Sequence, residues 1–348
     1  MKNVTQNYWL FSPATDLLAF LGSAVISLLL LAFGWQFGFL NSETPDLMWI
    51  SASLLIDVAH VWATTFRVYF DAEEFKRRML LYVSVPFAGY VLGVVLYSEG
   101  RMVFWRVLAY IAVFHFVRQQ YGWVALYRAK AKERSEITWW IDAVAIYIAT
   151  IYPLVYWMAA SKRNFSWFVE GDFFSISTVI AKFAFPVYVV ALSLYFAKSV
   201  FLYKKEGFLN IGKDIVVATT AICWYVGIIS FNSDYAFTVT NVIIHGVPYF
   251  VLIYFYAQAR RAKADKFYRS LTSNWLVFMA TLWLLAYTEE LLWNRSVWHE
   301  KGEIFGSYWN VEDIKMYIVP LLAVPQLTHY VLDGFIWKRK NNKQIGLI

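Results

Sequence analysis

Long apolar stretches alternate with short polar ones along the chain, and the apolar stretches have the length of membrane-spanning helices. Runs such as 17–40 and 275–292 match the roughly 20 residues that a helix needs to cross a hydrocarbon core. The first run has no basic leader and no small-residue cleavage site, so we interpret it as a span and not as a signal peptide. The apolar windows predict spans at 16–39, 47–70, 79–97, 102–128, 137–160, 174–202, 212–232, 234–260, 272–293 and 312–337.

This pattern predicts an all-α fold, namely a polytopic integral membrane bundle of about ten transmembrane helices in a single domain covering 1–348. Basic residues gather after the even-numbered spans, whereas the connections after odd-numbered spans are acidic or mixed. The positive-inside rule then places both termini in the cytoplasm, and we expect a multi-pass protein of a bacterial inner membrane. The basic segments are 76–78, 128–134, 198–205, 260–269 and 338–343.

Composition agrees with lipid as the main solvent. Hydrophobic residues make up 60% of the 348 residues and charged residues 16%, whereas soluble domains carry about 25% charged residues. The net charge of +7 could suit nucleic acid, but its residues lie in short loops between spans, so we expect no nucleic-acid partner. Cys223 is the only cysteine, which excludes an internal disulfide, a cysteine-based metal cage and an iron–sulfur cluster.

Four of the five histidines lie inside predicted spans: His60, His115, His245 and His329. They occupy the second, fourth, eighth and tenth spans, which all run from outside to inside, at depths that differ by roughly 9 Å. A single histidine inside a span is most simply explained by a hydrogen bond to a neighbouring helix. Because ionisable residues are costly inside a membrane and usually functional there, four at similar depth favour a shared metal or cofactor site.

Each of these histidines has a carboxylate or an amide three or four positions away on its own helix, where it could accept a hydrogen bond from the second ring nitrogen of a metal-bound histidine. Asp57 and Asp333 could bind the metal themselves or only orient a ring, and the sequence leaves both alternatives open. No tight motif such as His-Glu-x-x-His is present, so the catalytic residues stay unknown. The predicted supporting residues are Asp57, Asp333, Asn241, Gln119 and Gln326.

Neutral imidazoles suit iron, zinc, copper or nickel. Iron is the favoured metal, and zinc or copper are alternatives. Haem is a further alternative because histidines on facing helices can be axial ligands. Two stacked haems would separate the histidines into pairs at different depths, so their common depth favours a compact non-haem site.

The arrangement of four histidines on separate spans resembles the bacterial Brp/Blh-type carotene-cleaving membrane oxygenases. In that family four histidines bind iron and an apolar substrate enters from lipid. The likeness covers the histidine arrangement and the architecture. Membrane fatty-acid desaturases and hydroxylases are less similar because their paired-histidine motifs are absent. The segment 329–338 is similar to uncharacterised bacterial integral membrane proteins, which implies no function.

We therefore expect a metal-dependent membrane enzyme, an iron oxygenase or related oxidoreductase, whose partner is a membrane lipid or another apolar small molecule. The sequence indicates no particular protein partner. One alternative is a transporter or channel in which the same polar residues line a path. Another is a haem-binding electron-transfer subunit.

Other charged residues near span ends have simpler interpretations. Arg67 and Arg118 lie toward the inner ends of their helices, where an arginine can bind a lipid headgroup or pair with Asp57, Asp71 or Asp333. Asp142 and the neighbouring pair at 289 and 290 also lie near presumed ends, so we expect them to be interfacial.

Overall fold

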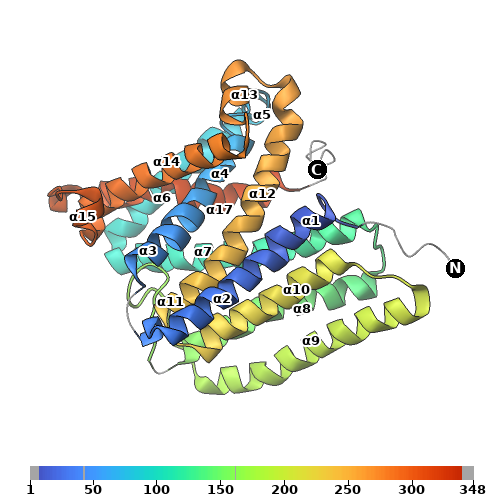
Figure 1. The fold of residues 1–348 in the computed structure, drawn as a ribbon. Coiled ribbons are helices and arrows are strands. Elements are labelled where there is room, and N and C mark those ends of the chain that lie inside the picture. The colour runs from blue at the N-terminus through green and yellow to red at the C-terminus, as the bar shows by residue number, and fades with distance from the viewer. Residues whose placement is uncertain (1–7, 42–43, 161, 339–348) are drawn as a thin grey trace. The chain divides into compact units, whose positions relative to one another are not determined.

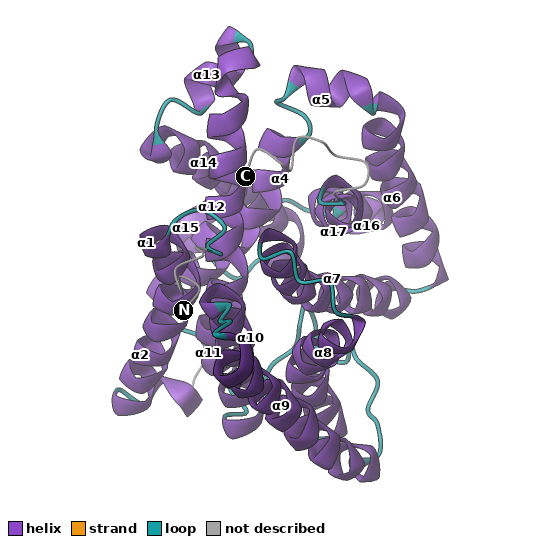
Figure 2. Cartoon of the chain, turned by 90° about the vertical axis from the view of Figure 1, so that its right-hand side faces the viewer, coloured by secondary structure: helices purple, strands orange, loops and turns teal. Residues whose placement is uncertain are grey.

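The structure is a computed structural model that describes residues 8–41, 44–160 and 162–338. Every regular element in these ranges is a helix (Figure 2). The basic stretch 339–343 lies outside the described residues. Within the described residues, eight helical segments are long and apolar enough to cross a membrane: Pro13–Gln36, Asp46–Arg67, Met79–Glu99, Glu136–Ala159, Thr178–Glu206, Ile211–Ser230, Asp234–Lys263 and Trp275–Trp298.

These segments confirm the predicted all-helical chain with many potential membrane crossings. The other two predicted spans are also helical. Helix α7 (Arg101–Lys130) covers one, and α16 (Lys315–Leu322) with α17 (Val324–Ile336) covers most of the other. The number of about ten crossings and the cytoplasmic position of both termini stay predictions.

The chain divides into two compact units, each made of several chain segments. The first unit comprises 1–48, 116–166 and 173–248, and the second comprises 49–115, 167–172 and 249–348. Both α7 and α12 (Ile243–Arg260) contribute residues to each unit. The prediction that 1–348 forms a single membrane domain stays a prediction.

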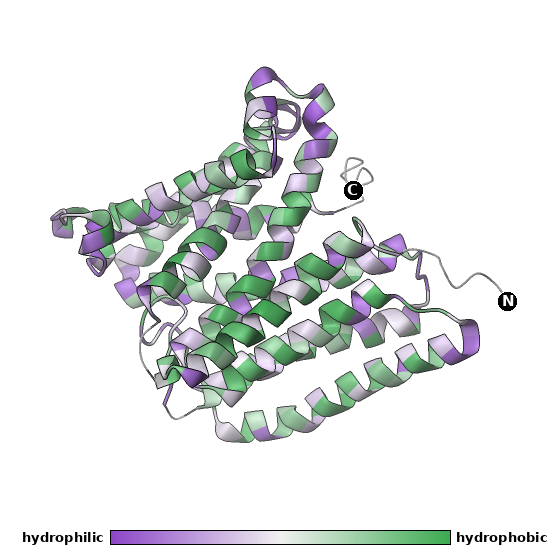
Figure 3. Ribbon diagram, viewed as in Figure 1, coloured by the Kyte–Doolittle hydropathy of each residue, from purple (hydrophilic) through white to green (hydrophobic). Residues whose placement is uncertain are grey.

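The first unit is a group of long helices in which α8 and α9 lie side by side (Figure 1). Helix α9 is apolar along most of its length and hydrophilic at its C-terminal end (Figure 3). It exposes large apolar side chains such as Phe183 and Phe196, as a lipid-facing helix does. The unit contains α1 (Pro13–Asp16), η1 (Leu17–Gly22), α2 (Ser23–Gln36), η2 (Phe39–Asn41), the last part of α7, α8 (Glu136–Ala159), α9 (Thr178–Glu206), α10 (Ile211–Trp224), η4 (Tyr225–Ser230), α11 (Asp234–Phe237), η5 (Thr238–Val242) and the start of α12.

Side-chain caps explain where several of these helices begin. Ser135 accepts a hydrogen bond from the backbone of α8, Ser177 from α9 and Asn210 from α10. Such caps satisfy backbone N–H groups that have no partner inside the helix. Helix α9 ends at Gly207, whose φ of +63° is the left-handed conformation that glycine adopts most easily.

A buried ion cluster joins four segments of the first unit. The Asp142 carboxylate of α8 is fully buried and pairs with Arg128, Lys198 and Lys213. Lys213 also lies 2.6 Å from a carboxylate oxygen of Glu133. The expectation that Asp142 is interfacial stays a prediction, but its carboxylate is buried within the protein, where cations from three other segments surround it and make this burial tolerable.

The second unit packs around two apolar clusters that both involve α17 or the residues just before it. Phe104, Trp105 and Trp293 belong to the first cluster, and Tyr82 and Leu332 to the second. Its elements are η3 (Trp49–Val58), α4 (Ala59–Arg67), α5 (Ala72–Arg77), α6 (Met79–Glu99), the first part of α7, most of α12, η6 (Arg261–Lys263), α13 (Lys266–Leu271), α14 (Trp275–Trp293), η7 (Asn294–Trp298), α15 (Gly302–Phe305), η8 (Glu312–Ile314), α16 and α17. The short α3 (Asp46–Met48), which directly precedes η3, belongs to the first unit.

A second polar network lies where α4 turns into α5. Asp71 caps α5 by accepting from the backbone N–H of Glu74 at 3.1 Å. It also accepts from the Arg260 side chain at 2.7 Å and from the Tyr256 hydroxyl at 2.7 Å. Burial raises the pKa of Asp71, but the hydrogen bonds from Arg260, Tyr256 and the Glu74 backbone outweigh it, so this pKa is lowered.

The lowered pKa of Asp71 predicts an acid-sensitive contribution to stability. A carboxyl group whose pKa is lower in the folded protein stabilises the fold above its unfolded pKa of about 3.9. That stabilisation is lost as the pH falls through the folded value. We expect Asp71→Asn to lower the unfolding temperature at pH 7, and the gap from wild type to shrink below pH ~4. Thermal unfolding in detergent at several pH values measures this difference in unfolding temperature. A difference that stays constant from pH 7 to pH ~3 would contradict the prediction.

Candidate metal centre

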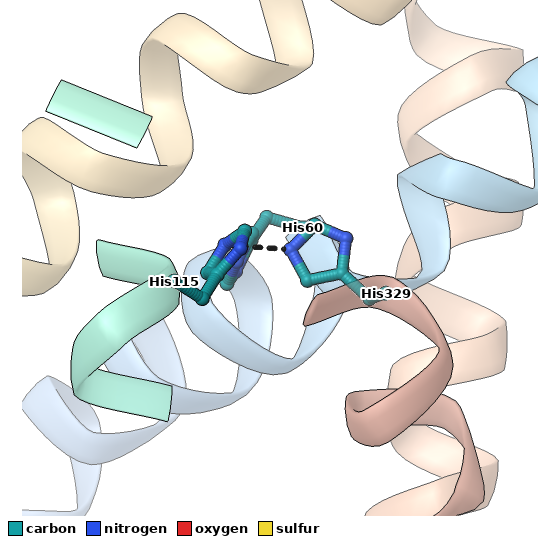
Figure 4. A group of neighbouring side chains, drawn as sticks. All are labelled: His60, His115 and His329. Carbon is teal, nitrogen blue, oxygen red and sulfur yellow. Dashed lines mark hydrogen bonds between the residues drawn. The ribbon is translucent and has the colours of Figure 1, made fainter. Parts of the chain in front are cut away.

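Three of the four predicted histidines form one buried cluster in the second unit. His60 comes from α4, His115 from α7 and His329 from α17, and none is more than 4% exposed. Their rings point toward one another from three helices (Figure 4). One ring nitrogen from each lies within 4.8 Å of the others, and the Nε2 atoms of His115 and His329 are 3.0 Å apart. We call these residues the three-histidine cluster.

His60 is oriented by its own helix. Its Nδ1 donates to the backbone carbonyl oxygen of Asp57, and Oδ1 of Asp57 lies 3.5 Å from the same nitrogen. Because a carbonyl oxygen can only accept, the proton is on Nδ1, which points to Nε2 as the coordinating atom. Asp57 belongs to the π-helical segment η3, directly before α4, and π-helical turns inside longer helices often occur at functional sites.

His329 is oriented by a chain of hydrogen bonds that ends on a carboxylate. Its Nδ1 lies 2.7 Å from the Thr64 hydroxyl, which lies 3.1 Å from the Tyr249 hydroxyl. Tyr249 in turn donates to Oδ1 of Asp333 at 2.6 Å. Because the single hydroxyl proton of Tyr249 goes to Asp333, Thr64 must donate to Tyr249 and accept from Nδ1 of His329. His329 therefore carries its proton on Nδ1, and its Nε2 faces the cluster.

Asp333 also lies beside the third ring of the cluster. Its Oδ2 is 3.9 Å from Nδ1 of His115, and its Oδ1 is 4.0 Å from Nδ1 of His329. The carboxylate therefore stands on the Nδ1 side of both rings, opposite the Nε2 atoms that approach each other. This position suits an acceptor that orients metal-bound histidines better than it suits a metal ligand.

The donor set fits a transition metal. Two nitrogens bound to one tetrahedral ion at about 2.0–2.1 Å lie roughly 3.3 Å apart. The Nε2 atoms of His115 and His329 are 3.0 Å apart, and one nitrogen from each of the three histidines lies within 4.8 Å of the others. These two distances bracket that value. Three histidine ligands with a fourth position left open are typical of catalytic zinc sites, and neutral imidazoles also suit iron and copper. The cluster therefore needs only small ring movements to hold an ion.

His245 belongs to the first unit. Its ring is fully buried and stacks on Phe116 with the ring centroids 3.6 Å apart. Gln119 donates to its backbone carbonyl at 2.8 Å. Asn241, one turn earlier, donates to the Phe237 carbonyl at 3.3 Å. The prediction that His245 binds the metal stays a prediction.

Glu289 is the residue that sequence reasoning missed. It lies near the presumed end of a span and is only 3% exposed in α14. It accepts from Trp62 at 2.5 Å, from Trp293 at 3.3 Å and from Gln326. Trp62 follows His60 on α4 and Gln326 precedes His329 on α17. Glu289 thus ties two histidine-bearing helices to α14, and the only sequence signal for it is its place, with Glu290, in a pair of acidic residues inside a mostly apolar helix.

The two arginines that sequence reasoning singled out have different surroundings. Arg67 is fully buried, donates to Tyr256 at 3.1 Å and lies 3.4 Å from a carboxylate oxygen of Glu74. Its ion-pair partner is thus Glu74. Arg118 is exposed and donates to the hydroxyl of Tyr147 in the first unit.

Comparisons with protein-family models, with curated proteins and with solved structures find no match for this chain. The resemblance to the Brp/Blh-type oxygenases therefore still rests on the histidine arrangement and stays a prediction.

Proposed function

We propose that the second unit binds a transition metal through His60, His115 and His329 and that the protein is a metal-dependent membrane enzyme. The observation that carries this proposal is the convergence of three buried imidazoles from three helices. The histidine donors support iron, zinc, copper or nickel, and the resemblance in histidine arrangement makes iron the metal that we propose. A metal held in this way would bind and activate dioxygen or a substrate oxygen at its open coordination position.

The chain's own residues would hold the ligands in place. The Asp57 carbonyl and the Thr64 hydroxyl keep the Nδ1 protons of His60 and His329 pointing away from the metal. The carboxyl group of Asp333 lies behind the rings of His115 and His329. Such partners raise the basicity of the ligands and restrict ring rotation. These contacts support a preorganised site in preference to three histidines that meet by chance.

We further propose that the substrate is lipid-soluble. His60 lies within one of the segments long and apolar enough to cross a membrane, so a substrate would reach the cluster most directly from the hydrocarbon region. The proposed location is a bacterial inner membrane, with about ten crossings and both termini in the cytoplasm.

The geometry favours a compact ion over haem. Two axial nitrogens on one iron would lie about 4 Å apart, with the macrocycle between them. The Nε2 atoms of His115 and His329 are only 3.0 Å apart, so a haem between them would require both rings to retract. A proton path is the other alternative, because the chain from His329 through Thr64 and Tyr249 to Asp333 is continuous.

Elemental analysis of protein purified without chelators tests the proposal. We expect about one transition-metal ion per chain and no Soret band in the absorption spectrum. Protein that stays metal-free after incubation with iron, zinc or copper salts would contradict the metal site. A Soret band would instead support the haem alternative.

A further inference from the structure

A mostly apolar pocket of about 480 Å³ opens between α9 and α10 in the first unit. Both helices pack against α8 (Figure 1). Ten of the twelve residues that line the pocket are aliphatic or aromatic, and the other two are Ser199 and Asp214. The volume lies within the range of small-molecule sites, which combine apolar walls with a few placed polar groups. The polar groups therefore indicate what the pocket can bind.

The Asp214 carboxylate is held in a fixed position in the wall of this pocket. Its Oδ1 accepts from the Tyr195 hydroxyl at 2.6 Å and from the Ser199 hydroxyl at 3.2 Å. Within the described part of the chain, no hydrogen bond to its Oδ2 is found. Because the protons of Tyr195 and Ser199 are already donated to Oδ1, these two hydroxyl oxygens can only accept further bonds. A molecule that binds at Asp214 must therefore donate a hydrogen bond.

The charges around Asp214 are already balanced, so the donor should be uncharged. Three carboxylates and three cations lie together in this part of the unit, namely Glu133, Asp142, Asp214, Arg128, Lys198 and Lys213. Lys198 and Lys213 both interact electrostatically with Asp214. A charged ligand would add one uncompensated charge to this buried group, which costs free energy. An uncharged donor leaves the balance unchanged.

The space beyond the carboxylate limits the size of the polar group. Asp214 and Ser199 also border a second cavity of about 10 Å³, which has room for about one water molecule. A hydroxyl group beside Oδ2 fits this limit, whereas a phosphate or a sugar needs more space. The Tyr203 hydroxyl, which also belongs to the lining of the larger pocket, can donate or accept and therefore does not restrict the ligand.

We propose that this pocket binds a long-chain alcohol, whose hydroxyl group donates to Oδ2 of Asp214 and whose chain lies against the apolar wall. A hydrogen bond to an ionised acceptor is stronger than one between neutral groups, and the ten apolar lining residues cover the chain. All lining residues belong to the first unit, so the proposal does not depend on the metal site.

Photolabelling of the full-length protein in phosphatidylcholine vesicles tests this proposal. The probes are hexadecanol, hexadecanoic acid and hexadecylamine with the same mid-chain diazirine, each at the same mole fraction in the membrane, and mass spectrometry maps the labelled peptides. We expect the alcohol to label the segment 192–222 at least about fivefold more than the acid or the amine. Ala218→Trp, which fills the pocket, should abolish this labelling. Ile211→Trp adds the same side chain at an exposed position of α10 outside the lining and is the matched control.

Asp214→Ala should reverse the preference between two probes, which a merely structural role of Asp214 would not do. Without the Asp214 charge, the acid probe supplies the missing carboxylate, so we expect it to label more strongly than the alcohol. Helical content by circular dichroism and elution as a single species establish that each variant is folded. Wild-type labelling by the alcohol that does not exceed labelling by the acid or the amine would overturn the proposal. An unchanged preference in folded Asp214→Ala, or equal losses in Ala218→Trp and Ile211→Trp, would do the same.

Discussion

His329→Ala is expected to weaken metal binding by at least about 100-fold. Loss of a partner behind a metal-bound histidine typically costs 10–100-fold in affinity, and loss of the ligand itself costs more. His329 contacts both other members of the cluster, since its Nε2 lies 3.0 Å from His115 and its ring centroid 4.9 Å from that of His60. Metal content after dialysis, together with titration against a competing chelator, measures the change.

Three further variants make this result specific. Thr64→Val keeps the side-chain shape and removes the hydroxyl 2.7 Å from Nδ1 of His329, so we expect roughly a tenfold loss of affinity. His299→Ala alters a histidine outside the cluster, whose Nε2 bonds the Arg295 carbonyl, and should leave metal content unchanged. His245→Ala tests whether that histidine is also a ligand. Wild-type metal content in folded His329→Ala would refute the proposed site.

The sequence predicted the histidines of the cluster better than it predicted their partners. Position inside a predicted span selects His60, His115 and His329, and it also selects His245, which belongs to the first unit. Partners were assigned by spacing along one helix, and this rule selected Asp57 and Asp333, both of which lie near a cluster histidine. Thr64 and Tyr249 reach His329 from other helices, and no spacing rule along one helix can find such contacts.

The helices can be predicted from the sequence, whereas the burial of their charged residues cannot. Apolar length and polar breaks are local properties, so they identified the helices. The burial of Asp142 and Glu289 depends on which other helices pack beside them. The cations around Asp142 are 14, 56 and 71 positions away in sequence. A residue near a span end therefore looks interfacial until its neighbours in space are known.

Asp142→Ala is expected to lower the free energy of unfolding by about 3–5 kcal/mol, the range measured when one partner of a buried ion pair is removed. Without this carboxylate, Arg128, Lys198 and Lys213 would remain close together in a buried site. Denaturant or thermal unfolding in detergent measures the change. The matched control is Glu312→Ala, which removes the exposed partner of Lys315 and should cost less than about 1 kcal/mol.

A double-mutant cycle separates lost charge pairing from general damage to packing. Lys213 lies 2.9 Å from Asp142 and 2.6 Å from Glu133, so Lys213→Met alone should also destabilise the protein. If the cluster is held by charge compensation, Asp142→Asn combined with Lys213→Met should cost less than the sum of the single changes, by at least about 1 kcal/mol. The double variant removes one negative and one positive charge together, so the net charge of the site stays as in the wild type, whereas each single change shifts it by one unit. Strict additivity would show that Asp142 stabilises the unit through its packing and not through its charge.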